Sequence, residues 1–126
     1  MSLTGMNVLN QSEQQLRSLT KETLDQQIHG ISFSPYVEGQ GPGSEATADQ
    51  IESRLDIIAG NVKWIRSFSC TNGNQLIPEI AKSRGLKTLV GAWLDDNLEN
   101  NEVEINNLIE VAKAGHVDIA AVGNEV

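Results

Sequence analysis

Short apolar runs alternate with longer amphipathic stretches along the chain, and the two patterns predict strands and helices in turn. The apolar runs predict four strands, at residues 30–34, 62–68, 87–93 and 117–122. The fourth is apolar on consecutive residues from Ile119 to Val122, which is typical of a strand buried on both faces of a parallel sheet. Pro35 ends the first strand, because proline cannot donate a hydrogen bond to a neighbouring strand.

Helical spacing fills the stretches between these strands. Ile51, Leu55 and Ile58 recur at i, i+4 and i+7, and Thr47 with Gln50 has the pattern of a capping box at the start of that helix. Glycines predict the ends of two further helices, whose apolar residues are Leu76, Ile77, Ile80 and Ala81 in the first and Val103, Ile105, Leu108, Ile109 and Ala112 in the second.

Residues 1–28 are polar and carry only a thin apolar stripe, at Leu16, Leu19, Leu24 and Ile28. This spacing predicts a helical lead that packs at one end of the domain, and Ser12 with Gln15 forms a second capping-box pattern. Met1 to Leu3 are consistent with a vector-derived start.

The predicted order after the lead is βαβαβαβ, with strands starting about every 25 to 30 residues, the period of a βα unit. Crossovers of this length make neighbouring strands parallel. A complete (βα)8 TIM barrel needs about 250 residues, and this chain has 126. We therefore predict an α/β fold with a lead at 1–28 and half of a TIM barrel at 29–126.

The net charge and the single cysteine limit which partners and which chemistry the chain can have. A formal net charge of −8 argues against nucleic acid or an anionic membrane as a partner and favours a neutral or cationic ligand. Cys70 has no second cysteine for an internal disulfide, and we interpret it as a buried thiol. No apolar run approaches the roughly 18 residues of a membrane span, and the amino terminus lacks the apolar segment of a secretory signal.

Candidate chemistry gathers where the predicted strands end. Asn124 and Glu125 follow the fourth strand, at the edge where α/β barrels carry their active sites. A polar strand terminus without a role is the alternative. Tyr36, Phe68 and Trp93 stand at or just past the ends of the first three strands, where a ring can stack on a ligand or simply pack at the rim.

Four other side chains are weaker candidates for a functional role. Arg66 lies within an apolar strand, so its guanidinium needs a carboxylate or carbonyl partner; it either orients a catalytic glutamate or forms a structural ion pair. Trp64 is expected in the core. His29 and His116 precede strands at the opposite end, and neither has a partner at metal-ligand spacing.

Four segments in order carry a family resemblance: GISFSPY, VKWIRSFSC, GLKTLVGAWLDDN and VDIAAVGNEV. Together they resemble the amino-terminal half of a glycoside hydrolase family 17 catalytic domain, of the bacterial kind related to β-1,3-glucanases, over roughly residues 29–126. The last segment is the most specific, because VGNE resembles the acid/base signature of retaining (βα)8 glycosidases.

The resemblance implies a role for each residue of that signature. Glu125 would be the general acid/base, and Asn124 would hydrogen-bond the 2-hydroxyl of the sugar, with no metal and no cofactor. Retaining glycosidases also need a nucleophilic carboxylate about 5 to 5.5 Å away, which such enzymes carry at the end of the seventh strand. We expect this chain to hold half an active site, and to have no turnover alone. Its loop carboxylates are interpreted as solvated charge: Glu38, Glu45, Asp95, Asp96 and Glu99.

Two function classes remain open. In the first, the parent protein acts on β-1,3-glucan, either as a hydrolase or as a glucanosyltransferase, and is expected to be extracytoplasmic. In the second, the half-barrel is a non-enzymatic module that self-associates, because four open strands leave two unpaired edges and an uncovered apolar face. Two copies would then close an eight-stranded barrel across a two-fold axis.

Overall fold

The computed structural model describes residues 5–124. Its centre is a parallel sheet of four strands in the order β1-β2-β3-β4, with neighbours in sequence also neighbours in space. The strands are β1 (Ile28–Ser32), β2 (Val62–Ser67), β3 (Lys87–Ala92) and β4 (Ile119–Val122). The predicted first strand was therefore placed two residues too late, and the other three were right to within one or two residues.

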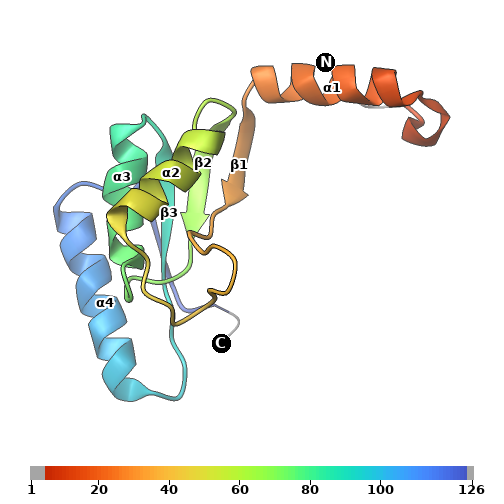
Figure 1. The fold of residues 1–126 in the computed structure, drawn as a ribbon. Coiled ribbons are helices and arrows are strands. Elements are labelled where there is room, and N and C mark those ends of the chain that lie inside the picture. The colour runs from red at the N-terminus through yellow and green to blue at the C-terminus, as the bar shows by residue number, and fades with distance from the viewer. Residues whose placement is uncertain (1–4, 125–126) are drawn as a thin grey trace.

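Three helices cover one face of this sheet: α2 (Ala48–Ile58), α3 (Ile77–Ser83) and α4 (Leu98–Lys113) (Figure 1). The short 3-10 turn η2 (Asn74–Leu76) leads into α3, whose first turn accommodates Pro78. Ile51 and Leu55 of α2 and Ile77 of α3 pack with Ile65 of β2 in the main core. The chain is thus an α/β fold that matches a partial TIM barrel, as predicted.

None of the described residues covers the opposite face of the sheet (Figure 1). The register places Arg66, Leu89 and Ile119 in one row across three strands, and this row lines a hollow of about 290 Å³ together with Trp64. Trp64 is half-buried and lies against His29, so its predicted core position was wrong. The double burial predicted for β4 was wrong too, since Ile119 is 48% exposed.

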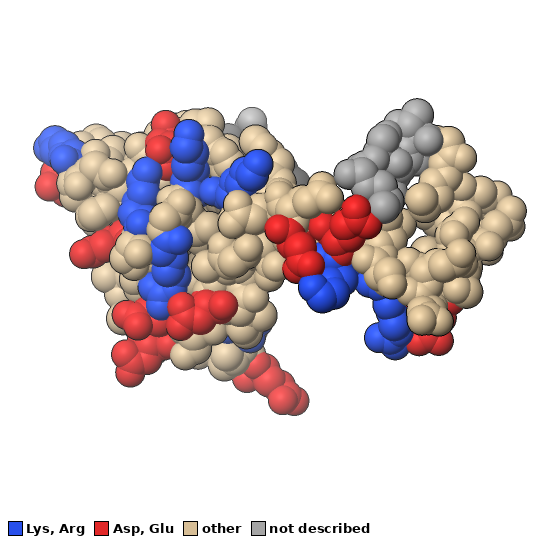
Figure 2. Space-filling view, turned by 90° about the horizontal axis from the view of Figure 1, so that it is seen from above, with Lys and Arg blue, Asp and Glu red and all other residues tan. Residues whose placement is uncertain are grey.

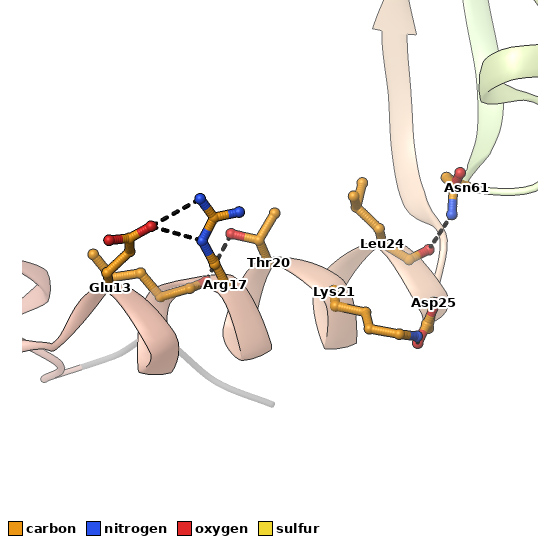
Figure 3. Close-up of a pocket in the computed structure, with 8 residues that line it drawn as sticks. Glu13, Arg17, Thr20, Lys21, Leu24, Asp25 and Asn61 are labelled. Atoms are coloured by element: carbon orange, nitrogen blue, oxygen red, sulfur yellow. Dashed lines mark hydrogen bonds and ion pairs between the residues drawn. The ribbon is translucent and has the colours of Figure 1, made fainter.

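The amino-terminal lead forms the 3-10 turn η1 (Val8–Asn10) and α1 (Glu13–Asp25). The predicted capping box is present, with Gln15 N donating to Ser12 Oγ and Ser12 N to the Gln15 side chain. The predicted packing was wrong, because α1 projects away from the sheet and buries no residue (Figure 1). At the joint with the sheet, Asn61 donates to the Leu24 carbonyl at 3.3 Å (Figure 3). Ile28, the last residue of the predicted stripe, already belongs to β1 and packs against the main core.

Thr47 caps α2 by accepting a hydrogen bond from Gln50 N at 3.3 Å. In a capping box the Gln50 side chain would also accept a hydrogen bond from the Thr47 backbone N–H. Here the Gln50 side chain makes a longer-range hydrogen bond in its place. The Gln50 amide instead donates to the Pro35 carbonyl at 2.7 Å, which ties α2 to the loop that follows β1.

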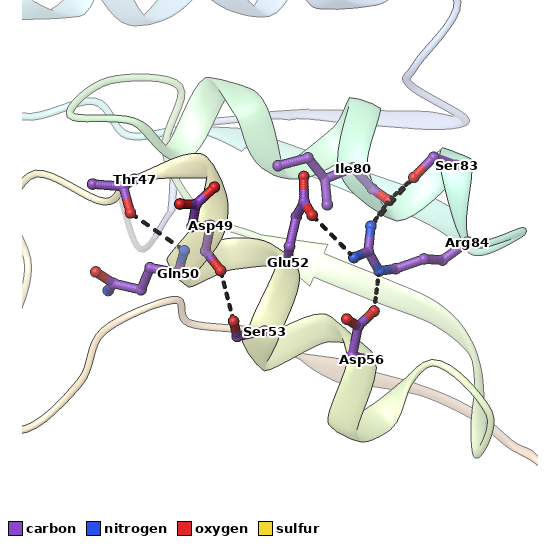
Figure 4. Close-up of polar contacts among 9 residues, drawn as sticks. All are labelled: Thr47, Asp49, Gln50, Glu52, Ser53, Asp56, Ile80, Ser83 and Arg84. Carbon is purple, nitrogen blue, oxygen red and sulfur yellow. Dashed lines mark hydrogen bonds and ion pairs between the residues drawn. The ribbon is translucent and has the colours of Figure 1, made fainter.

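Ion pairs join neighbouring elements at the amino-terminal end of the sheet, where Lys and Arg side chains form a row flanked by Asp and Glu (Figure 2). Arg84 links α3 to α2, with Nε 2.6 Å from Asp56 and Nη2 3.8 Å from Glu52 (Figure 4). Lys82 lies 2.6 Å from Asp118, just before β4. These contacts fix the end of the sheet that lies away from the candidate site.

Candidate active site

The three aromatic residues predicted at strand ends line one cleft. Tyr36, Phe68 and Trp93 contribute to a cavity of about 530 Å³ at the carboxyl edge of the sheet. Tyr36 Oη accepts a hydrogen bond from Asn74 at 3.4 Å, which holds its half-buried ring. Trp93 is 41% exposed. The cleft therefore offers aromatic surface from three separate βα loops to a ligand from solution.

Arg66 connects β2 to the end of β4. Its Nη2 donates to Asn124 Oδ1 at 2.8 Å, and its guanidinium lies 4.6 Å from the centre of the Phe68 ring. The Nε atom is buried and has no partner within residues 5–124. The sequence left two roles open for Arg66, a structural ion pair and the orientation of a catalytic glutamate. Among the described residues no carboxylate pairs with Arg66. Its hydrogen bond goes instead to Asn124, the neighbour of the predicted catalytic glutamate.

Glu125, the predicted acid/base, lies outside the described residues. The chain is described as far as Asn124, two residues beyond β4. Gly123 N donates to the Ala92 carbonyl at 3.1 Å, so the end of β3 holds the backbone that leads to Asn124. The position of Asn124 is thus defined by the β3 contact of the preceding residue, Gly123, and by the hydrogen bond from Arg66 to its own side chain.

Glu104 of α4 is a buried acidic residue that the sequence analysis missed. It is 1% exposed, lines the cleft, and accepts hydrogen bonds from the segments that follow β2 and β3. The position of Glu104 around the helix, relative to the buried residues of α4, could have indicated its burial. Glu104 stands one turn before Leu108, which is 4% exposed, whereas Val103 and Ile109 of the predicted stripe are 49% and 43% exposed.

The loop carboxylates predicted as solvated charge are all exposed; they are Glu38, Glu45, Asp95, Asp96 and Glu99. Asp95 reaches the cleft, and its Oδ1 accepts a hydrogen bond from Asn97 N at 2.8 Å, which shapes the turn before α4. Within the described part of the chain, no group of three His, Cys, Asp or Glu side chains is arranged to hold a metal ion. None of its helices is long and apolar enough to cross a membrane.

Cys70 is the buried thiol that the sequence predicted. It is 0% exposed, and Sγ donates to the Gly91 carbonyl at 3.5 Å. Burial, followed by the nearby charge of Glu104, raises the pKa of this thiol to about 12. Because only the thiolate is a strong nucleophile, Cys70 has a packing role at neutral pH.

A hollow beside α1 is larger than the cleft, at about 620 Å³, and Figure 3 shows its lining. It is formed by one side of the projecting helix and by Asn61, at the amino-terminal end of the sheet. Active sites of α/β barrels lie at the carboxyl edge. The aromatic cleft is therefore the better candidate.

Comparison with known protein families decides the affiliation. The model of the BtgE/BtgC glycoside hydrolase domain matches residues 30–126. This chain belongs to that glycoside hydrolase family. The lead that forms α1 lies outside the match, in agreement with its separation from the sheet. No curated protein matches the chain.

One solved structure with the same fold is an active-site mutant of the Rhizomucor miehei β-1,3-glucanosyltransferase, in complex with laminaritriose. The TM-score is 0.62 at 23% sequence identity, over 81% of this chain. The aligned part spans 38% of the transferase chain. The likeness supports the partial-barrel architecture of this glycoside hydrolase domain.

Proposed function

We propose that the residues at the carboxyl edge of the sheet form the acid/base half of an active site. The enzyme is a retaining glycoside hydrolase of family 17, of the bacterial kind, that acts on β-1,3-glucan. The observation that carries the proposal is the aromatic cleft beside the Arg66–Asn124 pair, at the carboxyl edge of a glycoside hydrolase domain. The solved relative of the same fold binds laminaritriose, which supports a laminari-type ligand. The reaction is hydrolysis, with transfer to a sugar hydroxyl as the variant outcome at the same site.

Glu125, Asn124 and Arg66 each have a separate role in this mechanism. Glu125 protonates the glycosidic oxygen as the bond breaks and then takes a proton from the incoming water or sugar hydroxyl. Asn124 hydrogen-bonds the 2-hydroxyl, a contact that strengthens in the oxocarbenium-like transition state. Arg66 fixes the Asn124 side chain through its 2.8 Å hydrogen bond and so acts as a positioning residue.

The cleft suits a neutral polysaccharide. Tyr36, Phe68 and Trp93 present ring surface that stacks on the apolar face of a sugar. The exposed carboxylate of Asp95, which lines the cleft, disfavours an anionic ligand and leaves a neutral glucan unaffected.

A polypeptide consisting of these 126 residues alone should not turn over glucan. A retaining mechanism requires two carboxylates about 5 to 5.5 Å apart, one of which must be a free nucleophile. Of the two described carboxylates that line the cleft, Glu104 is buried with its oxygens engaged in hydrogen bonds, and Asp95 is an exposed turn residue. Neither of these two carboxylates is therefore available as the free nucleophile.

The test separates binding from turnover. Purified chain and Glu125→Gln are incubated with laminari-oligosaccharides, and products and anomeric configuration are followed. We expect no cleavage by either, and binding by both. In the same assay, Trp93→Ala should weaken binding about 3- to 10-fold through the lost ring contact, and Trp64→Ala, at the other end of β2, should leave it unchanged. Cleavage that disappears in Glu125→Gln would refute the half-site, and absence of binding would refute the glucan assignment.

A second candidate function, self-association of the half-barrel, has one observation in its favour. The uncovered face carries Leu89 and Ile119, the latter 48% exposed on the edge strand β4. We propose that two copies would bury this face. Light scattering should then show a dimer that Ile119→Lys dissociates, while Ile57→Lys, at a 72% exposed position on α2, leaves it intact. A monomer at high concentration would reject the assembly.

A further inference from the structure

Glu104 is unusual for a buried carboxylate because no cation accompanies it. Among residues 5–124 it is the only buried acidic side chain, at 1% exposure, and none of their ion pairs includes it. A buried charge without a counter-ion must be compensated by hydrogen bonds. The arrangement of these bonds indicates what the carboxylate does.

The two oxygens of Glu104 divide their contacts between two chain segments. Oε1 accepts from the hydroxyls of Ser69 and Thr71, at 2.5 and 2.7 Å. Oε2 accepts from the backbone N–H groups of Cys70 at 2.6 Å and Trp93 at 3.2 Å. One side chain of α4 therefore joins the segment that follows β2 to the first residue beyond β3.

Polar neighbours on α4 extend the same contact. Asn107, one turn further on, donates to the Cys70 carbonyl at 2.7 Å. Asn101, one turn earlier, exchanges two hydrogen bonds with the backbone of Asp95, at 2.8 and 3.0 Å. Asn101, Glu104 and Asn107 of α4 thus face two loops with polar groups. Apolar residues of similar volume often stabilise a buried site equally well, so directional contacts here favour a role in geometry.

The segments that Glu104 joins carry two walls of the cleft. Phe68 directly precedes the Ser69-Cys70-Thr71 segment, and Trp93 supplies its own backbone N–H to the carboxylate. We propose that Glu104 is a positioning residue for the glucan site, which holds the Phe68 and Trp93 rings at the separation that a sugar chain requires. This inference rests on the proposed function of the cleft.

The geometry distinguishes two substitutions of Glu104. In Glu104→Gln, the amide oxygen takes the place of Oε2 and keeps both backbone N–H groups, because the Ser69 and Thr71 hydroxyls can rotate to accept from the new NH₂. In Glu104→Ala, the N–H groups of Cys70 and Trp93 lose their partner inside the protein. We expect Gln to preserve the site and Ala to release both segments.

The experiment uses a Trp64→Phe background, in which Trp93 is the sole tryptophan of the chain. Glu104→Gln and Glu104→Ala are compared with Glu102→Ala, an exposed glutamate on the same helix. Binding of laminari-oligosaccharides and acrylamide quenching of Trp93 fluorescence are both measured. We expect Glu104→Gln to bind within about threefold of its parent and Glu104→Ala to lose about tenfold or more, with increased quenching. Glu102→Ala should change neither.

Three outcomes decide the question. A folded Glu104→Ala that binds and is quenched like Glu102→Ala would overturn the positioning role. If the parent binds no laminari-oligosaccharide, the proposed function fails, and Trp93 quenching still reports whether Glu104 orders the segment. If Glu104→Ala does not fold, Thr71→Val replaces it. That variant removes one hydroxyl donor to Oε1, and unchanged binding and quenching in it would overturn the proposal.

Discussion

Asp118 offers a quantitative test of how the amino-terminal end of the sheet is held. Its carboxylate accepts hydrogen bonds from Lys82 Nζ at 2.6 Å and from Thr88 N at 2.8 Å. Thr88 is 1% exposed, so in Asp118→Ala its N–H is buried without this partner, at a cost of about 1 to 3 kcal/mol. The Lys82 and Asp118 side chains are 29% and 25% exposed, so solvent screens the ion pair to about 0.5 to 1 kcal/mol. We expect a total loss of about 1.5 to 4 kcal/mol.

Urea unfolding of Asp118→Ala, Lys82→Ala and the double variant measures the two contributions separately. Lys82→Ala should cost no more than about 1 kcal/mol, because the carboxylate then still accepts from Thr88 N. A Lys82→Ala variant as unstable as Asp118→Ala would refute the assignment of most of the stability to the buried N–H.

The pH dependence follows from the same contacts. Lys82 lowers the pKa of Asp118 below its ordinary value of 3.8, with a smaller contribution from the Thr88 N–H. The unfolded chain therefore binds the proton more tightly than the folded one, and the stability from Asp118 is present above about pH 3.8 and is lost as the pH falls towards the lowered pKa. The stability difference between the wild type and Asp118→Asn should be constant from about pH 7 to about pH 5 and shrink below that window. A constant difference down to acid pH would contradict the assignment.

Two other positions give independent predictions. In Gly73→Ala, a Cβ would lie 1.9 Å from the Ala46 carbonyl oxygen at φ +83°, whereas Gly85 has φ +75° and open space around it. Chemical denaturation should show a loss of about 1 kcal/mol for Gly85→Ala and clearly more for Gly73→Ala; equal losses would contradict the predicted clash. Cys70, with its pKa raised to about 12, should resist alkylation by iodoacetamide near neutral pH until the chain is unfolded. Rapid labelling of the native protein would contradict its burial.

The strand order was predictable because its signals are local. Each strand is an apolar run, and each crossover has a helical stripe, so parallel pairing follows from connection length. Packing partners were less accessible to this reasoning. The Ser12 and Gln15 cap of α1 was predicted correctly, yet nothing in so thin a stripe indicated that the helix would leave the domain. Capping depends on neighbours along the chain, whereas docking depends on apolar area elsewhere.

The same distinction explains which residues of the cleft the sequence could place. Tyr36, Phe68 and Trp93 were predicted from their places at strand ends, since parallel strands bring those ends to one edge. The hydrogen bonds that Gln50 and Glu104 make to loops at that edge were missed. A polar residue on the inner side of a helix resembles any surface polar residue unless its phase is compared with that of a buried neighbour.

These missed contacts suggest how the edge is built. The helices that follow β1 and β3 each send a polar side chain into the loops above the sheet: Gln50 of α2 donates to the Pro35 carbonyl, and Glu104 of α4 accepts from Trp93 N. Pro35 directly precedes Tyr36, so both contacts fix backbone beside an aromatic ring of the cleft. A rigid scaffold that fixes loop backbone lets ring positions be set without burying the rings. The exposure of Trp93, at 41%, is therefore compatible with a defined orientation, and that is the condition a stacked sugar requires.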